Sequence, residues 1–309
     1  MESPKRGSVH LDLISQYPEE VHFTYFGDEN DDIDLHSLDS NVPYRVILMI
    51  ILFSNLWTLV LTLLPVLITI GPNNYYAGHP DWYTGADIIR FIEPVGGLLL
   101  NVLILYKSGA FKEPMNNMKW WTLGLFFLGA AVYEQGAGFH SAANMFKNAV
   151  ETLPAQDDEV QDLHYYMRTV WEHEVSHYLY ACGLAVMHAT QAYSYKDVAS
   201  PQLGLTKTGK VLLFFSSLAL GLLVAGVAIE FPAGTIVGLI YIIVYGFGCI
   251  GGYMFHQHYY KQDKTILVYG RRPILHHFIL GYTWALAILI AWICFVGGFK
   301  SRSQASVLV

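Results

Sequence analysis

The sequence predicts an all-α polytopic membrane protein whose transmembrane domain is a bundle of seven helices. Of its 309 residues, 53% are hydrophobic and only 14% are charged, whereas soluble domains carry roughly 25% charged residues. The hydrophobic residues gather in long runs, and about 20 apolar residues in a helix are enough to cross the hydrocarbon core of a bilayer. We therefore expect an integral, multi-pass protein of the plasma membrane or an endomembrane.

The acidic net charge of −7 belongs to the N-terminal segment. Residues 1–43 contain ten acidic and two basic side chains, while the remaining 266 residues carry a net charge of +1. We expect residues 1–43 to be a disordered cytosolic tail, residues 44–299 to form the transmembrane domain and residues 300–309 to be a short C-terminal tail. Since no segment has the basic stripe of a nucleic-acid-binding protein, the expected partners are membrane lipids, and the oligomeric state stays open.

The first two helices follow from two apolar runs. Residues 44–70 are almost wholly apolar and stop at a Gly-Pro pair. The second run, residues 86–106, contains Arg90 and Glu93, which lie three positions apart and therefore share one helical face. The loop between the two runs is rich in Tyr, Trp, Asn and Pro, as is typical of a membrane–water interface.

Polar side chains interrupt the third and fourth predicted helices. The third begins near Trp120 and extends past Asn144, and the fourth covers about residues 163–193. Between them lies an acidic stretch, residues 157–159, which we expect to be a loop. These helices are less apolar than the others, so their assignment as spans depends on the polar residues finding partners inside the bundle.

Three apolar runs complete the bundle, at residues 211–229, 233–255 and 273–298. Pro273 opens the last run, where proline fits because the first turn of a helix has no partner for a backbone N–H. The three cysteines all lie inside apolar runs, so we expect buried free thiols rather than disulfides. They are Cys182, Cys249 and Cys294.

Basic residues in the short loops predict the orientation in the membrane. With seven spans, the N-terminus lies on the same side as the loops between helices two and three, four and five, and six and seven. Ten basic residues lie in those loops: Lys107, Lys112, Lys119, Lys196, Lys207, Lys210, Lys261, Lys264, Arg271 and Arg272. The other side carries chiefly Lys147, Lys300 and Arg302. Because cytosolic loops are enriched in Lys and Arg, we expect a cytosolic N-terminus and an exoplasmic or lumenal C-terminus.

Ionisable residues inside the predicted spans indicate a functional site, since such side chains are costly in a membrane unless they have partners. With the expected orientation most of them fall at a similar depth in the outer half of the bilayer, while Glu134 lies nearer the middle. Small residues around His140 allow close helix approach. The residues of the expected site are Glu134, His140 and Asn144 on the third helix, Glu172, His173, Glu174 and His177 on the fourth, and Glu93 on the second.

Three histidines among these residues predict a metal site. His140, His173 and His177 suit zinc, which catalytic sites hold through three protein ligands and an open position for water. Zinc lowers the pKa of that water to about 7, and Glu174 or Glu134 would then serve as general base. Iron is the alternative, because Glu-x-x-His, here Glu174 and His177, is the unit that di-iron helix bundles use.

Another group of histidines lies near the predicted cytosolic face. We expect His188 to be a hydrogen-bonded core residue. Neighbouring positions on a helix point about 100° apart, so we expect only one of His276 and His277 to face the bundle, where it could complete a second polar pocket.

Seven spans, a cytosolic N-terminus and intramembrane Glu, Ser, Asn and His resemble the heptahelical hydrolase superfamily of alkaline ceramidases and adiponectin/progestin-type receptors. The run from Gly138 to Ser141 is similar to the Gly/Ser-rich early helix of that superfamily, which carries one histidine. The resemblance implies a zinc-dependent hydrolase that cleaves an amide in a lipid. It departs from the family pattern at Gly136, where the family has serine, and in the spaced histidine pair, which lies on the fourth helix instead of the last.

The favoured function is therefore metal-dependent hydrolysis of a lipid, and several alternatives stay open. The polar residues could form hydrogen-bonded pairs that only fix helix packing. They could also be stations on the path of a proton-coupled or metal-ion transporter, or ligands of haem. A ligand-sensing receptor with seven helices would use a polar pocket of the same kind.

Overall fold

The structure is a computed structural model in which the described part of the chain is helical apart from its turns and connections. It describes residues 42–67, 85–111, 115–151, 158–198, 200, 204–231, 233–302 and 304–307. The acidic tail expected at residues 1–43 lies outside the described residues, apart from residues 42 and 43, which begin the first helix.

The described ranges contain twelve helical segments, of which eleven make up seven long helices and one is a short 3₁₀-helix. The first three are α1 (Val42–Leu67), α2 (Gly85–Lys107) and α3 (Asn117–Glu151). A fourth is continuous from α4 (Asp158–Tyr166) through the π-helix η2 (Met167–Val175) to α5 (Ser176–Ser194). The remainder are α6 (Lys207–Glu230), the run of α7 (Gly234–Tyr241), π-helix η3 (Ile242–Gly251) and α8 (Gly252–Tyr259), the short 3₁₀-helix η4 (Lys264–Leu267), and α9 (Pro273–Val296).

Five of these helices are long and apolar enough to cross a membrane. Within the described residues the spans are Tyr44–Thr62, Asp87–Lys107, Lys207–Glu230, Gly234–Tyr259 and Pro273–Val296. The helix α3 and the continuous helix from α4 to α5 carry too many polar residues to meet the same measure, and they are the two that the sequence marks as least apolar. The all-helical architecture is thus confirmed for the described residues, and the five apolar helices suit a multi-pass membrane protein. Seven spans and the orientation of the termini stay predictions.

Two local expectations differ from the structure. Asp158 and Glu159 do not lie in a loop but in the first turn of α4, where carboxylates interact favourably with the positive end of the helix dipole. The cysteines are free, as expected, but all three are exposed rather than buried. In a helix bundle that crosses a membrane, such positions face lipid.

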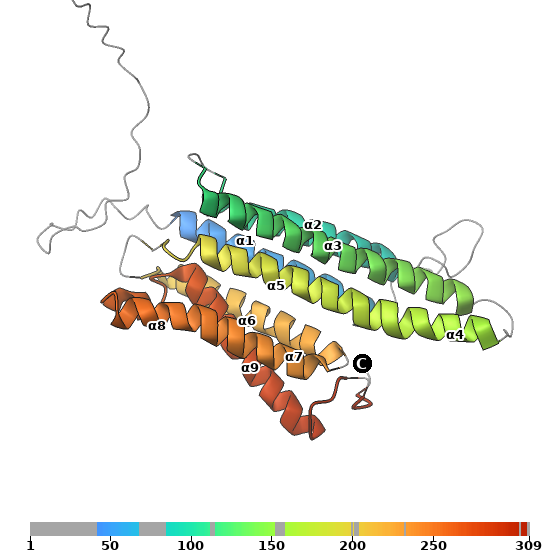
Figure 1. The fold of residues 1–309 in the computed structure, drawn as a ribbon. Coiled ribbons are helices and arrows are strands. Elements are labelled where there is room, and N and C mark those ends of the chain that lie inside the picture. The colour runs from blue at the N-terminus through green and yellow to red at the C-terminus, as the bar shows by residue number, and fades with distance from the viewer. Residues whose placement is uncertain are drawn as a thin grey trace, which may run out of the picture. The chain divides into compact units, whose positions relative to one another are not determined.

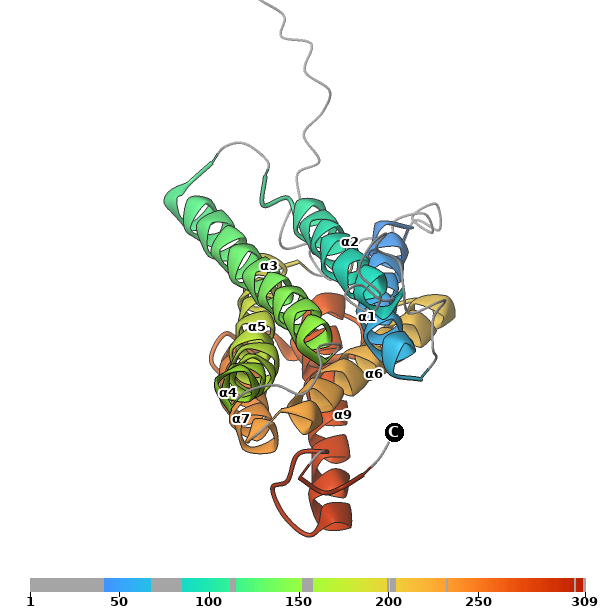
Figure 2. The same cartoon turned by 90° about the vertical axis from the view of Figure 1, so that its right-hand side faces the viewer.

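The helices pack in two groups (Figure 1). One contains α1, α2, α3 and α5, in which α3 lies along α5 and α1 lies along α2. The other contains α6 to α9, in which α6 packs on α9. The view in Figure 2 shows α6 passing beneath α1 and α2, and contacts between α1 and α6 join the two groups.

Glycines set the close approach of α3 and α5. An added Cβ at Gly183 on α5 would lie 2.6 Å from the carbonyl oxygen of Gly129 on α3. At Gly136 it would lie 2.7 Å from the carbonyl oxygen of Ser176. Real side chains do not tolerate such contacts with backbone, so these positions accept only glycine at this helix separation. The polar residues of the two helices are therefore brought within reach of one another.

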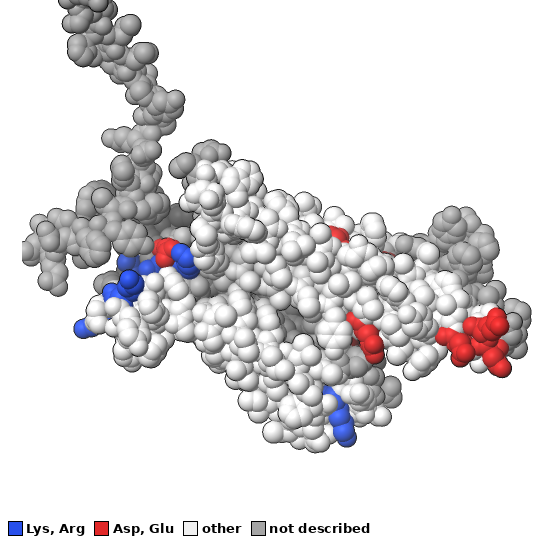
Figure 3. Space-filling model, viewed as in Figure 1, with Lys and Arg blue, Asp and Glu red and all other residues white. Residues whose placement is uncertain are grey.

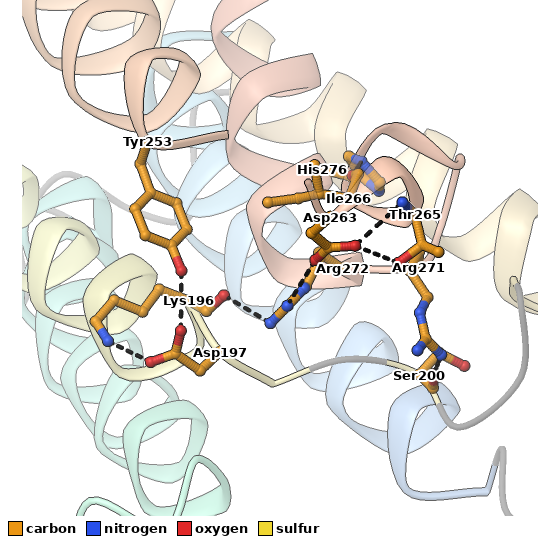
Figure 4. Close-up of polar contacts among 10 residues, drawn as sticks. All are labelled: Lys196, Asp197, Ser200, Tyr253, Asp263, Thr265, Ile266, Arg271, Arg272 and His276. Carbon is orange, nitrogen blue, oxygen red and sulfur yellow. Dashed lines mark hydrogen bonds and ion pairs between the residues drawn. The ribbon is translucent and has the colours of Figure 1, made fainter. Parts of the chain in front are cut away.

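Polar contacts join the connection after α5 to the connection between α8 and α9 (Figure 4). Arg272 donates from Nη1 to the carbonyl oxygen of Lys196 at 3.0 Å and from Nη2 to Asp263 Oδ2 at 3.2 Å. Tyr253 on α8 donates to Asp197 at 2.9 Å. These contacts hold the ends of three helices together on one side of the bundle.

Charged side chains are separated along the bundle (Figure 3). On the face shown, most Lys and Arg gather at the end where α8 finishes, and the largest group of Asp and Glu lies at the end where α4 begins, with smaller acidic groups elsewhere. The gathering of Lys and Arg at one end is the feature on which the expected orientation depends.

Candidate functional site

A cavity of about 510 Å³ lies between α1, α2, α3, η2, α5 and α6, a size typical of small-molecule sites. Its lining from α1 and α6 is largely aliphatic, whereas α2, α3, η2 and α5 supply most of its polar side chains. The aliphatic residues include Leu59, Leu61, Leu222, Leu223, Val227 and Ile229. The polar ones include Arg90, Glu93, His140, Lys147, Glu172, His173 and His177. The cavity is therefore amphipathic.

The three outer histidines come together in its wall. The rings of His140 and His177 have centroids 5.1 Å apart, with planes 17° from parallel. The rings of His173 and His177 have centroids 5.6 Å apart, with planes at 74°. Phe231, just after α6, packs on the other side of His177 at 5.1 Å. The helices α3 and α5 thus face each other as the sequence predicted, and His177 stands at the centre of the group.

The π-helix η2 decides which side chains of this segment face the cavity. A π-helix closes its hydrogen bonds five residues apart rather than four, so residues i and i+5 come onto one face. Arg168 with His173, and Glu172 with His177, are such pairs, and all four line the cavity. In an α-helix Glu174 would share a face with His177, three positions further on. Glu174 is, however, not among the residues that line the cavity.

Glu172 and His177 each present a buried polar atom with no partner. Glu172 Oε1 lies 3.4 Å from Nζ of Lys147, and the side chain of Ser176 donates to the Glu172 backbone carbonyl. Among the described residues, Glu172 Oε2 and His177 Nδ1 have no hydrogen-bond partner. Buried polar atoms are normally satisfied, and an exception calls for an explanation such as an absent ligand.

Glu93 occupies another part of the cavity wall, where two tyrosines hold it. Tyr180 donates to Glu93 Oε1 at 2.9 Å and Tyr133 donates to the same oxygen at 3.2 Å. The two phenol oxygens are themselves 3.2 Å apart. This network joins α2, α3 and α5, so a carboxyl group expected in the pocket serves here as the meeting point of three helices.

The C-terminal segment returns to the cavity. Arg302 binds the carboxylate of Glu230, at the end of α6, through two bonds of 2.6 and 2.8 Å. Its backbone N–H also donates to the carbonyl oxygen of Ile229 at 2.9 Å. Both Arg302 and Glu230 line the cavity. The sequence did not indicate four of the residues that line the cavity, namely Arg168, Tyr180, Glu230 and Arg302. Hydropathy and helical periodicity do not show which residues near a helix end, or beyond it, fold against a pocket.

Other predicted site residues lie away from this cavity's lining. Asn144 is buried and donates from its side-chain amide to Asp87 on α2. Glu134 is half-buried, and its Oε1 has no partner among the described residues. Glu174 is also half-buried. The two carboxylates expected to act as general base, Glu134 and Glu174, thus do not line the cavity with the histidines, whereas Glu172 does.

The inner histidines form separate structural contacts. His276 accepts at Nδ1 from the backbone N–H of Gly270. Its Nε2 lies 3.0 Å from the carbonyl oxygen of Ile266, and Figure 4 draws both of these residues. His277 Nδ1 lies 3.2 Å from Ser216 Oγ on α6, and the ring of His188 packs on Phe278 at 5.5 Å.

His276 and His277 are both buried, but in different surroundings. The connection between α8 and α9 covers His276, while α6 covers His277. Neither residue lines the cavity that holds the outer histidines.

As placed, the histidines do not form a ready metal site. No group of three or more His, Cys, Asp or Glu side chains in the described ranges has a geometry that could hold a metal ion. Two imidazoles that share a tetrahedral zinc at about 2.0–2.1 Å have ring centroids roughly 5 Å apart, which is close to the separations here. The spacing therefore suits zinc while the ring directions do not, so zinc binding would need the imidazoles to turn.

Comparison with known proteins returns no relative. No protein-family model matches the chain, and no curated protein or solved structure shows significant similarity to it.

Proposed function

We propose that this chain is a membrane-embedded protein that binds a lipid in the amphipathic cavity and hydrolyses a bond near its polar end. The observation that carries the proposal is the division of the cavity lining. Aliphatic side chains of α1 and α6 suit hydrocarbon, and imidazoles and a carboxylate of α3, η2 and α5 suit a polar group. A bundle of apolar helices also gives a lipid direct access from the bilayer.

Glu172 and His177 are the residues suited to acid–base chemistry. Their unpartnered atoms, Oε2 and Nδ1, belong to side chains that line the cavity. A general base must come within hydrogen-bond reach of the proton that it removes. Glu172 would accept a proton from the water that attacks an ester or amide carbonyl, and His177 would relay that proton to the leaving group as its bond to the carbonyl carbon breaks.

Zinc-dependent hydrolysis is the second form of this proposal. The centroid separations among His140, His173 and His177 favour it, and the resemblance to heptahelical hydrolases points the same way. Because the ring directions do not converge, the acid–base roles above are assigned to side chains without any step through a metal. Iron is the alternative metal.

Lipid turnover by the purified full-length chain tests the proposal. The protein in detergent is incubated with a mixture of membrane lipids, alone and with added zinc or iron, and products and retained lipids are identified by mass spectrometry. We expect Glu172→Gln and His177→Ala to lose turnover. Glu174→Gln is the matched control, since it makes the same change two positions away and outside the cavity lining, and it should keep turnover.

The same preparations separate the alternatives. Metal analysis of wild type beside His177→Ala shows whether a metal is bound through this histidine. Retained lipid without turnover under any condition would refute hydrolysis and leave a binding or receptor function. Absence of any retained lipid, together with ion flux in reconstituted vesicles, would refute the proposal in favour of a transporter.

A further inference from the structure

The charges around the cavity are unevenly paired. Four cationic side chains line it, namely Arg90, Lys147, Arg168 and Arg302, together with three carboxylates, Glu93, Glu172 and Glu230. Arg302 and Glu230 neutralise each other through two short bonds, and Glu93 is held by two tyrosines. The remaining three cations share the cavity lining with Glu172 and Glu93, so cations outnumber carboxylates there.

These three cations are only loosely engaged. Arg90 Nη1 is 3.6 Å from Asp87 Oδ1, a carboxylate that also accepts from Asn144. Lys147 is 3.4 Å from Glu172. Arg168 is exposed and has no ion-pair partner among the residues that the structure describes. Most of their N–H donors therefore remain available.

The three cations come from different helices and gather around the same histidines. Arg90 is on α2, Lys147 near the end of α3 and Arg168 in η2. All three line the cavity together with His140, His173 and His177. The excess positive charge is therefore centred on the polar end of the cavity.

We propose that the lipid bound here carries an anionic phosphate head group, recognised by Arg90, Lys147 and Arg168. The planar guanidinium of arginine donates two parallel hydrogen bonds to phosphate oxygens, and lysine adds a point charge. The acyl chains would lie against the aliphatic residues of α1 and α6. This inference rests on the proposed lipid-binding function and names the class of lipid.

Binding of three probes to the detergent-solubilised full-length chain tests the inference. The probes are dioleoyl phosphatidic acid, dioleoylglycerol with the same chains and no phosphate, and inorganic phosphate alone. We expect phosphatidic acid to bind at least about tenfold more tightly than either other probe, as the gain of a charge-assisted hydrogen bond implies. Arg168→Gln should reduce that preference, and Arg168→Lys should restore part of it because the charge returns.

Lys261→Gln is the control, since it removes one exposed cation in a connection that does not line the cavity. It should leave all three affinities unchanged. Equal affinity for the two lipids would overturn the phosphate inference and leave lipid binding intact. Inorganic phosphate that binds as tightly as phosphatidic acid would overturn it too, because the ligand would then be a free anion. Failure of both lipids to bind would refute the proposed function itself.

Discussion

Glu93 is a buried carboxyl group in a wall of apolar helices, and the hydroxyl groups of two tyrosines explain why it is tolerated there. Tyr133 comes from α3 and Tyr180 from α5, so each hydrogen bond also joins two helices. A buried carboxyl group that loses a partner keeps the full cost of its desolvation. At this residue, stability and the shape of the cavity depend on the same contacts.

Tyr180→Phe should therefore destabilise the protein by about 1–3 kcal/mol, because it removes the shorter of the two bonds to Glu93. The measurement is thermal unfolding in detergent. Tyr260→Phe is the control, since this side chain is 74% exposed. Similar melting temperatures for the two variants would show that the network contributes nothing to stability.

Asp263, which lies outside the membrane-spanning helices, makes a pH-dependent contribution to the stability of the fold. Burial raises the pKa of its carboxyl group, but hydrogen bonds from Thr265 and Arg272 outweigh this effect and hold the pKa below its ordinary value. A carboxyl group whose pKa is lower in the folded state stabilises the fold above its unfolded pKa, about 3.9. That contribution is lost as pH falls through the lower, folded value.

The melting temperature of wild type should therefore exceed that of Asp263→Asn at neutral pH. The difference should shrink once the pH drops below about 3.9. Paired melting curves across this range check the expectation. A difference that stays constant down to the lowest pH would show that the ion pair with Arg272 is not responsible.

At the scale of elements, the close packing of α3 on α5 places the histidines. The backbone at Gly183 fits directly against Gly129 and Tyr133. The π-helix η2 then turns Glu172 and His177 to one side. Small residues and an altered helical period together convert two polar helices into one cavity wall.

Gly183→Ala should force α3 and α5 apart and destabilise the protein by about 1–3 kcal/mol, as overpacking of a well-packed core does. Gly138→Ala on α3 is the matched control, because an added Cβ there meets nothing within 4 Å. Its expected effect is neutral or stabilising, since alanine favours helix over glycine by about 1 kcal/mol. Thermal unfolding of both variants tests this prediction. An equal loss of stability in each would refute the packing argument.

At the scale of the whole molecule, the open question is how many helices cross the membrane. Five helices are apolar enough by themselves, while α3 and the helix from α4 to α5 need their polar side chains to be covered. The structure covers many of them within the cavity wall. Seven spans and a cytosolic N-terminus therefore stay predictions.

Glycosylation tags test this topology. A tag inserted between α2 and α3 should remain unmodified, and one between α3 and α4 should be glycosylated, because α3 carries the chain across. A tag at the C-terminus should be modified and one at the N-terminus should not. Finding the tags on both sides of α3 in the same state would show that α3 and α5 form a hairpin that does not cross.

Local patterns in the sequence determined the helices and the first members of the site. Apolar runs and Pro273 at a first turn are properties of neighbouring residues, so the helical segments follow from them. His140 and His177 were expected to meet for a similar reason, since both lie among small or polar residues inside long helices, and their rings are 5.1 Å apart.

Tertiary structure alone decided which polar groups share the cavity. The change of period in η2 selects Glu172 in place of Glu174, and no spacing rule for an α-helix indicates it. Arg302 reaches Glu230 because the chain after α9 folds back on α6, a contact between residues far apart in sequence. Helix formation depends on hydrogen bonds and hydropathy within one segment, whereas a binding site depends on which segments pack together.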